Sequence, residues 1–193
     1  MKPIRLIPLL TGLLMISGAQ AAVIVTAVES GGDVIFSTAG GSLDLTGLIK
    51  GSTVPIPSSI SPDSGYYAVG GATASNSIDL YNGGGVLSSW SSFGTGVGRS
   101  ADAGTGSMIG LNSSAGDGYL WVPTGYVSGA TLGASSSTYY GETFATLGIT
   151  AGTYVSSWTG DTMTLQAVPI PAAVWLFGSA LAGLGWLRRK QTV

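Results

Sequence analysis

The chain has 193 residues, with nine acidic and seven basic side chains, no His and no Cys. These absences exclude thiol nucleophiles, disulfides, thiolate metal sites and a Ser-His-Asp triad. The basic residues gather at the two ends, so the middle has two of them against all nine acidic ones, and its net charge of −7 gives no electrostatic reason to bind nucleic acid or anionic lipid.

The first 21 residues have the three parts of a secretory signal peptide. Two basic residues come first, and residues 6–16 form an apolar run too short to span a membrane comfortably. Residues 19–21, Ala-Gln-Ala, form a small-x-small cleavage site. We therefore expect cleavage between Ala21 and Ala22, in preference to a retained N-terminal anchor.

Short β-strands separated by glycine turns are predicted for the body, residues 22–167. Two β-branched runs, 23–29 and 34–38, flank a Ser-Gly-Gly-Asp turn and predict a hairpin. Residues 152–158 and 161–167 predict a second hairpin that closes the body.

Between these hairpins the pattern varies. Residues 42–46 alternate with period two, which predicts a strand with its two leucines inward. Three prolines exclude a central strand from residues 50–65, and we interpret this segment as a loop. Residues 86–99 are predicted to be irregular, and 141–147 to form one short turn of helix. Further extended segments are predicted at 66–72, 77–81, 107–112, 118–122 and 130–140.

The nine or ten predicted strands favour an all-β fold, an antiparallel β-sandwich that is jelly-roll-like. The first and last strands of the body are both well patterned. That pattern suits a sandwich in which the two ends of the body pair or lie side by side.

The C-terminal segment, residues 168–193, has three parts. The first is the tetrapeptide Val168, Pro169, Ile170 and Pro171. Its prolines keep the backbone extended. Residues 172–187 are apolar and, with the tetrapeptide, make 20 uncharged residues, enough to cross a bilayer as a helix. The third part is the basic cluster Arg188, Arg189 and Lys190. This cluster predicts a cytoplasmic C-terminus.

The ordered combination of these three parts resembles the PEP-CTERM sorting signal of Gram-negative bacteria, with Ile170 in place of the Glu of the Pro-Glu-Pro motif. The resemblance implies that the tail is held in the inner membrane. It also implies that an exosortase-type enzyme cleaves near Pro169 to Pro171, and that the body then passes to the cell surface or an exopolysaccharide matrix. The body is similar to exported domains found in front of such tails, over residues 32–34, 41–45, 126–129 and 144–154.

A plain single-pass anchor is the alternative interpretation of the tail. It explains neither the two prolines nor the many small residues of the apolar run. The tetrapeptide alone is not diagnostic, because residues 54–57 repeat it, Val-Pro-Ile-Pro, with no apolar run or basic cluster after them.

No catalytic, cofactor-binding or metal-binding residue is predicted in the body. Two carboxylates would suffice for glycoside hydrolysis. Most of the acidic residues, however, lie within two residues of a glycine and are interpreted as turn-formers, namely Asp33, Asp63, Asp102, Asp117 and Asp161. These turns leave a structural calcium ion as an open alternative.

Aromatic side chains could stack on sugar rings, with Trp90 expected to be the most exposed and Trp121 buried. We therefore expect a non-enzymatic exported cell-envelope or matrix protein with no cofactor. Its expected partners are the inner membrane, an exosortase-type enzyme and extracellular polysaccharide, but no nucleic acid. A carbohydrate-binding or adhesive domain is the first alternative, and a carboxylate-dependent glycoside hydrolase the second.

Overall fold

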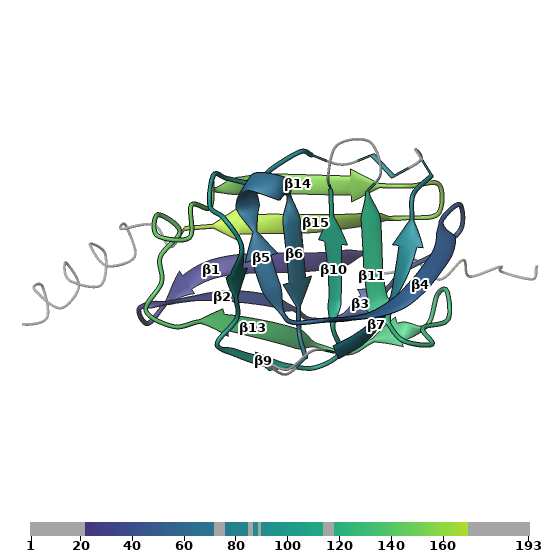
Figure 1. The fold of residues 1–193 in the computed structure, drawn as a ribbon, viewed down its shortest axis with the longest axis horizontal. Coiled ribbons are helices and arrows are strands. Elements are labelled where there is room, and N and C mark those ends of the chain that lie inside the picture. Colours follow the sequence, from purple (N-terminus) through teal and green to yellow (C-terminus); the bar gives the residue numbers. More distant parts are fainter. Residues whose placement is uncertain (1–21, 72–75, 85–86, 89, 114–117, 170–193) are drawn as a thin grey trace, which may run out of the picture.

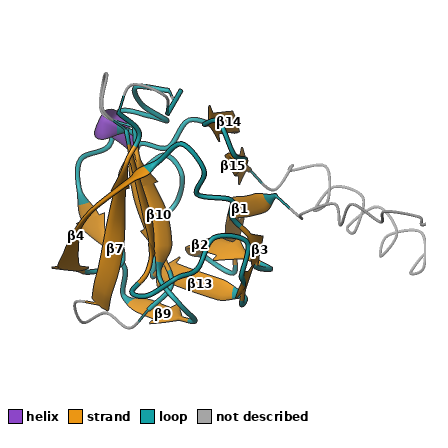
Figure 2. Ribbon diagram, turned by 90° about the vertical axis from the view of Figure 1, so that its right-hand side faces the viewer, coloured by secondary structure: helices purple, strands orange, loops and turns teal. Residues whose placement is uncertain are grey.

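A computed structural model describes residues 22–71, 76–84, 87–88, 90–113 and 118–169. Over these residues the chain is all-β, with one turn of 3-10 helix, η1 (Pro62–Ser64). Two large sheets form two layers, seen edge-on in Figure 2, beside a small two-stranded sheet. The all-β prediction is confirmed, and the arrangement is consistent with a β-sandwich.

The six-stranded sheet has the order β14-β15-β1-β2-β13-β9 (Figure 1). Its strands are β1 (Val23–Ser30), β2 (Asp33–Thr38), β9 (Ala103–Thr105), β13 (Ser135–Tyr139), β14 (Gly152–Ser157) and β15 (Thr162–Val168). The first and last strands of the body pair with each other, as expected. Among the described strands this is the one parallel pair, and the remaining pairs are antiparallel.

The seven-stranded sheet has the order β4-β7-β11-β10-β6-β5-β8. Its strands are β4 (Ile49–Ile56), β5 (Ser59–Ser61), β6 (Tyr66–Val69), β7 (Asn76–Asn82), β8 (Arg99–Ser100), β10 (Ile109–Asn112) and β11 (Tyr119–Pro123). The small sheet pairs β3 (Gly41–Ser42) with β12 (Thr131–Leu132).

Both predicted hairpins are confirmed. The β1–β2 hairpin closes through Gly31 and Gly32, which both have positive φ, 66° and 92°. Such a turn matches the twist of the strands it joins, and glycine adopts it without steric cost. The β14–β15 hairpin pairs Ser157 with Thr162 beside its connection.

The interpretation of residues 50–65 as a loop is wrong, because they contain most of β4, all of β5 and η1. Among the described strands, β4 lies at the edge of its sheet and pairs only with β7. A proline is tolerated in an edge strand because one side of its backbone needs no partner. Pro62 occupies the first turn of η1, where a missing N–H costs little.

The predicted strand at residues 42–46 is shorter than expected, because β3 ends at Ser42. The burial pattern was nevertheless predicted correctly, since Leu43 and Leu45 are buried. Their backbone N–H groups donate to the side-chain oxygens of Tyr126 and Ser128, each at 2.8 Å, instead of to a strand.

The short helical turn predicted at 141–147 is present as a hydrogen-bonded turn in which the N–H of Leu147 donates to the carbonyl of Thr143 at 3.0 Å. Phe144 and Leu147 are buried, as expected.

One hydrophobic core lies between the two large sheets. Val25, Phe36 and Leu165 contribute to it from the six-stranded sheet, and Leu111 and Val122 from the seven-stranded sheet. A smaller apolar cluster that includes Ile78 and Trp121 is separate from it. Burial of these side chains is the main driving force for closing the two layers. In the described ranges, no helix is long and apolar enough to cross a membrane, and the predicted helix 172–187 falls outside them.

Candidate functional site

The folded body begins and ends beside the two predicted processing points. β1 begins at Val23, directly after the exposed Ala22. β15 ends at Val168, and the exposed Pro169 follows it. Because Val168 pairs with Val28, the predicted sorting motif begins within the sheet. The remaining predicted targeting residues lie outside the described part of the chain, namely Ala21, Ile170, Pro171, Arg188, Arg189 and Lys190.

The two ends of the body lie at opposite ends of one strand pair. β1 and β15 run in the same direction (Figure 1). Their register extends from Val23 opposite Met163 to Val28 opposite Val168. Val28, the partner of Val168, lies five residues beyond Val23 along β1. At a rise of about 3.3 Å per residue, the start of β1 and the end of β15 are therefore about 16 Å apart along the strand direction. The chain therefore enters the central strands of this sheet at one end and leaves at the other.

The second copy of the tetrapeptide shows one backbone conformation that this sequence adopts. Its first three residues, Val54 to Ile56, belong to the edge strand β4. Val54 lies opposite Ile78 and Pro55 opposite Ser77. The Val-Pro-Ile sequence is therefore compatible with an extended backbone in an edge strand.

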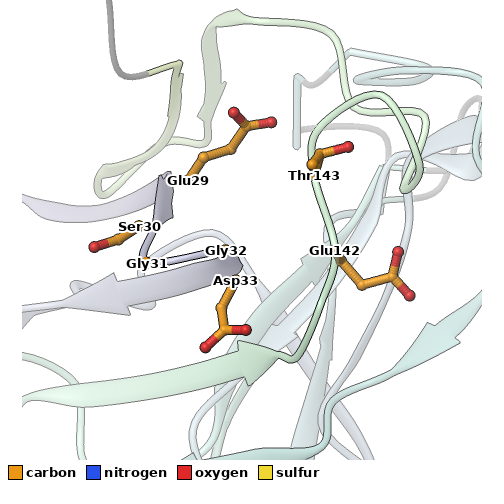
Figure 3. Close-up of a pocket in the computed structure, with 7 residues that line it drawn as sticks. All are labelled: Glu29, Ser30, Gly31, Gly32, Asp33, Glu142 and Thr143. Atoms are coloured by element: carbon orange, nitrogen blue, oxygen red, sulfur yellow. The ribbon is translucent and has the colours of Figure 1, made fainter. Parts of the chain in front are cut away.

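A pocket of about 370 Å³ lies where the β1–β2 turn meets the loop after β13. Three carboxylate side chains line it, those of Glu29, Asp33 and Glu142, and they point in different directions (Figure 3). Each carboxylate accepts a hydrogen bond. Glu29 accepts one from the N–H of Phe144, and Asp33 one from the N–H of Gly141 at 2.9 Å. Glu142 accepts one from the hydroxyl of Thr146 at 2.7 Å. The pocket does not present a facing carboxylate pair of the kind that glycoside hydrolysis needs.

Two further acidic residues, Asp161 and Asp102, also accept hydrogen bonds from backbone N–H groups. Asp161 accepts from the N–H of Thr162 at 2.7 Å and from the N–H of Asp44 at 3.1 Å. Asp102 accepts from the N–H of Tyr140 at 2.9 Å, and this bond, with that from Arg99, lowers the pKa of its carboxyl group. Within the described ranges, no three acidic side chains are arranged to hold a metal ion.

Asp79 is a buried, hydrogen-bonded carboxylate that the sequence analysis missed. It lies in the middle of β7 and is fully buried, on the face of the sheet that packs against the core. Its carboxylate accepts from the ammonium of Lys50 at 2.7 Å, the hydroxyl of Thr53 at 2.6 Å and the N–H of Gly125 at 2.9 Å. These donors, that of Lys50 first, lower its pKa to about 2.

The Asp79 network joins the edge strand β4, strand β7 and the turn after β11, so its contacts are structural. The sequence carries no local signal for this burial, because Asp79 alternates with Ile78 and Leu80 and period two therefore directs it away from their face. A buried carboxylate requires such partners, because an unpaired charge in a protein interior is costly.

The aromatic side chains pack mainly on one another. Trp121 is 5% exposed, which confirms its predicted burial, and its ring lies 4.6 Å from that of Tyr66. Trp90 is half-buried, stacked parallel to Tyr67 and tilted against Tyr154. Trp90 therefore packs within a cluster of aromatic rings, which weakens the case for stacking on a sugar.

Comparisons with known proteins were negative: no protein-family model, curated protein or solved structure matches the chain.

Proposed function

We propose that the chain is a non-enzymatic exported protein of the cell envelope or of an exopolysaccharide matrix. Residues 1–21 direct its export. Residues 168–193 hold it in the inner membrane, through a helix at 172–187, until an exosortase-type enzyme cleaves near Pro169 to Pro171. In this proposal the body is a jelly-roll-like sandwich, released to the surface or the matrix.

The supporting observation is that the first and last strands of the described body lie next to the two proposed cleavage points. β1 begins one residue after Ala22, and β15 ends one residue before Pro169. The buried apolar residues of the described chain lie between Val23 and Ala167. Cleavage at both points would therefore leave this core intact, as expected of a domain that functions after release.

The conformation of the second tetrapeptide adds support. Because residues 54–56 are extended in β4, the same residue types at 168–170 are suited to an extended backbone. Extended segments are readily bound by partner proteins through backbone hydrogen bonds. Ile170 would occupy the position at which the family has Glu.

The experiment is intact-mass analysis and cell fractionation of the protein from its native cells. We expect the mature chain to begin at Ala22, to end near Pro169 to Pro171 and to lie outside the inner membrane. Deletion of residues 188–190 should leave the tail unprocessed, because the basic cluster stops translocation.

The repeated tetrapeptide offers a matched control. Replacing Pro169 and Pro171 by Ala should alter processing, whereas replacing Pro55 and Pro57 by Ala should not. A wild-type chain that keeps Val193 and stays in the inner membrane would show that the tail is only an anchor, and the sorting proposal would then be wrong.

A further inference from the structure

The outer face of the six-stranded sheet carries a row of hydrogen-bonding side chains that crosses every strand. Alternation along each strand directs one set of side chains into the core and the other outward. The registers place six outward residues side by side in sheet order, and we call them the hydroxyl row: Thr153, Gln166, Thr26, Ser37, Ser136 and Thr105. With neighbouring strands about 4.8 Å apart, the row is about 24 Å long.

Most of this row has no partner within the described chain. The hydroxyl groups of Thr105 and Ser136 lie 2.9 Å apart, which confirms that neighbouring members share one face. The other four side chains form no hydrogen bond with any described residue, and all six are half-exposed or exposed. Their donors and acceptors are therefore available to a ligand.

The rows on both sides are apolar or hydroxyl-bearing. On one side Val168, Val28 and Ile35 lie next to one another across three strands. On the other side Thr164 lies between Val155 and Ile24, which are 53% and 43% exposed. None of the residues in these three rows is charged, although the body as a whole has a net charge of −7.

This combination favours a neutral ligand that is rich in hydroxyl groups. Hydroxyl and amide side chains both donate and accept hydrogen bonds, as sugar hydroxyls do. The exposed β-branched side chains offer apolar contact to the C–H faces of sugar rings. An anionic polymer would find no counter-charge on this face and would be repelled by the negative charge elsewhere on the body.

We propose that the hydroxyl row and the apolar rows beside it bind an extended chain of a neutral polysaccharide lying across the strands. The inference rests on the proposed function in one respect, since export brings the body into contact with such polymers. Binding itself is a property of the purified protein.

The test uses the full chain, purified in detergent and immobilised, with binding measured to a soluble mixed-linkage β-glucan, a dextran and a galactomannan. The row variant combines Thr26→Val, Ser37→Ala and Ser136→Ala. The matched control combines Ser52→Ala, Ser77→Ala and Ser100→Ala, which change three serines of the seven-stranded sheet that are exposed. We expect the row variant to weaken binding to at least one of these polymers at least tenfold, because three hydrogen bonds are lost, and the control to leave it unchanged.

Folding is checked separately by circular dichroism and thermal unfolding of each variant. A further variant, Ser37→Asp, places a charge at the centre of the row and should abolish binding while the fold is retained. The proposal would be overturned if the wild-type chain bound none of the three polymers. It would also be overturned if the control variant lost as much binding affinity as the row variant. Binding of the anionic polymer polygalacturonate as tightly as the neutral polymers would also overturn it. So would a row variant whose one effect is to dissociate an oligomer of this chain, because the row would then be an interface between copies.

These outcomes are distinguishable from a failure of the proposed function. A chain that binds a neutral polysaccharide but keeps its C-terminal tail would contradict sorting and leave the binding face in place. A correctly sorted chain that binds none of the three polymers would contradict only the binding face.

Discussion

At the scale of single residues, the most consequential side chain is Asp79. Its three hydrogen-bond donors come from Lys50 and Thr53 in β4 and from Gly125 after β11. Hydrogen bonds to a charged group are stronger than neutral ones, so removing the charge weakens the contacts with both β4 and the turn after β11. Lys50 is half-exposed, so it would not be left as a buried unpaired charge.

We predict that Asp79→Asn lowers the free energy of unfolding by about 1–3 kcal/mol at neutral pH, through weaker hydrogen bonds to this position. The control Asp63→Asn changes an exposed carboxylate and should have little effect. Chemical denaturation of the full chain in detergent would measure both. Equal stabilities of the two variants would contradict a structural role for Asp79.

The same residue predicts how stability depends on pH. Its pKa is about 2 in the folded chain and 3.8 ordinarily, so folding favours the ionised form. Its contribution is complete above about pH 4 and is lost as the pH falls toward 2. The thermal midpoint of the wild type should therefore drop more steeply over this interval than that of Asp79→Asn. Parallel curves would contradict the assignment.

At the scale of elements, the two glycines of the β1–β2 turn determine how the first hairpin closes. Their positive φ values are the ones that a two-residue turn between twisted strands needs. Nothing lies within 4 Å of a Cβ placed at either glycine. The cost of a side chain there is therefore conformational rather than steric.

We predict that Gly32→Ala destabilises the body by about 1–2 kcal/mol, the usual cost of a left-handed conformation for an L-residue. Gly133→Ala is the matched control, because a Cβ there also meets nothing within 4 Å and its φ lies outside the left-handed range. That control should be neutral or slightly stabilising. Thermal unfolding would distinguish them, and similar losses in both would argue against a role for φ.

At the scale of the whole molecule, the first and last strands of the body pair with each other in the middle of the six-stranded sheet. β1 and β15 are adjacent, with β2 beyond one and β14 beyond the other. Val23 and Val25 face the core from β1, and Met163 and Leu165 from β15, all fully buried. The first part of the body to be synthesised thus depends on the last for its sheet and for part of its core.

We predict that a chain ending at Pro169 folds, whereas one ending at Gly160 does not. The shorter chain loses β15, which separates β14 from β1 and removes several buried side chains, each worth about 1.5–3 kcal/mol. Limited proteolysis would show a resistant fragment beginning near Ala22 for the longer chain and none for the shorter. A resistant shorter chain would mean that β15 is dispensable.

The sequence by itself determined the all-β fold class, both terminal hairpins and the adjacency of the end strands. The two targeting segments stay predictions. These depend on local patterns, namely alternation, glycine turns and apolar runs. The tertiary structure decided what depends on position in a sheet. It placed β4 at an edge where prolines are tolerated, and ended β3 early because the side chains of Tyr126 and Ser128 take the next backbone N–H groups.

Only the tertiary structure revealed the partners of Asp79 and the hydroxyl row. Lys50 and Gly125 lie 29 and 46 residues away from Asp79 in the chain, and the six members of the row come from six separate strands. Each strand shows only that one side chain points outward. The order and register of the strands decide which outward side chains become neighbours, and these arise from the packing of the whole sheet rather than from any one segment.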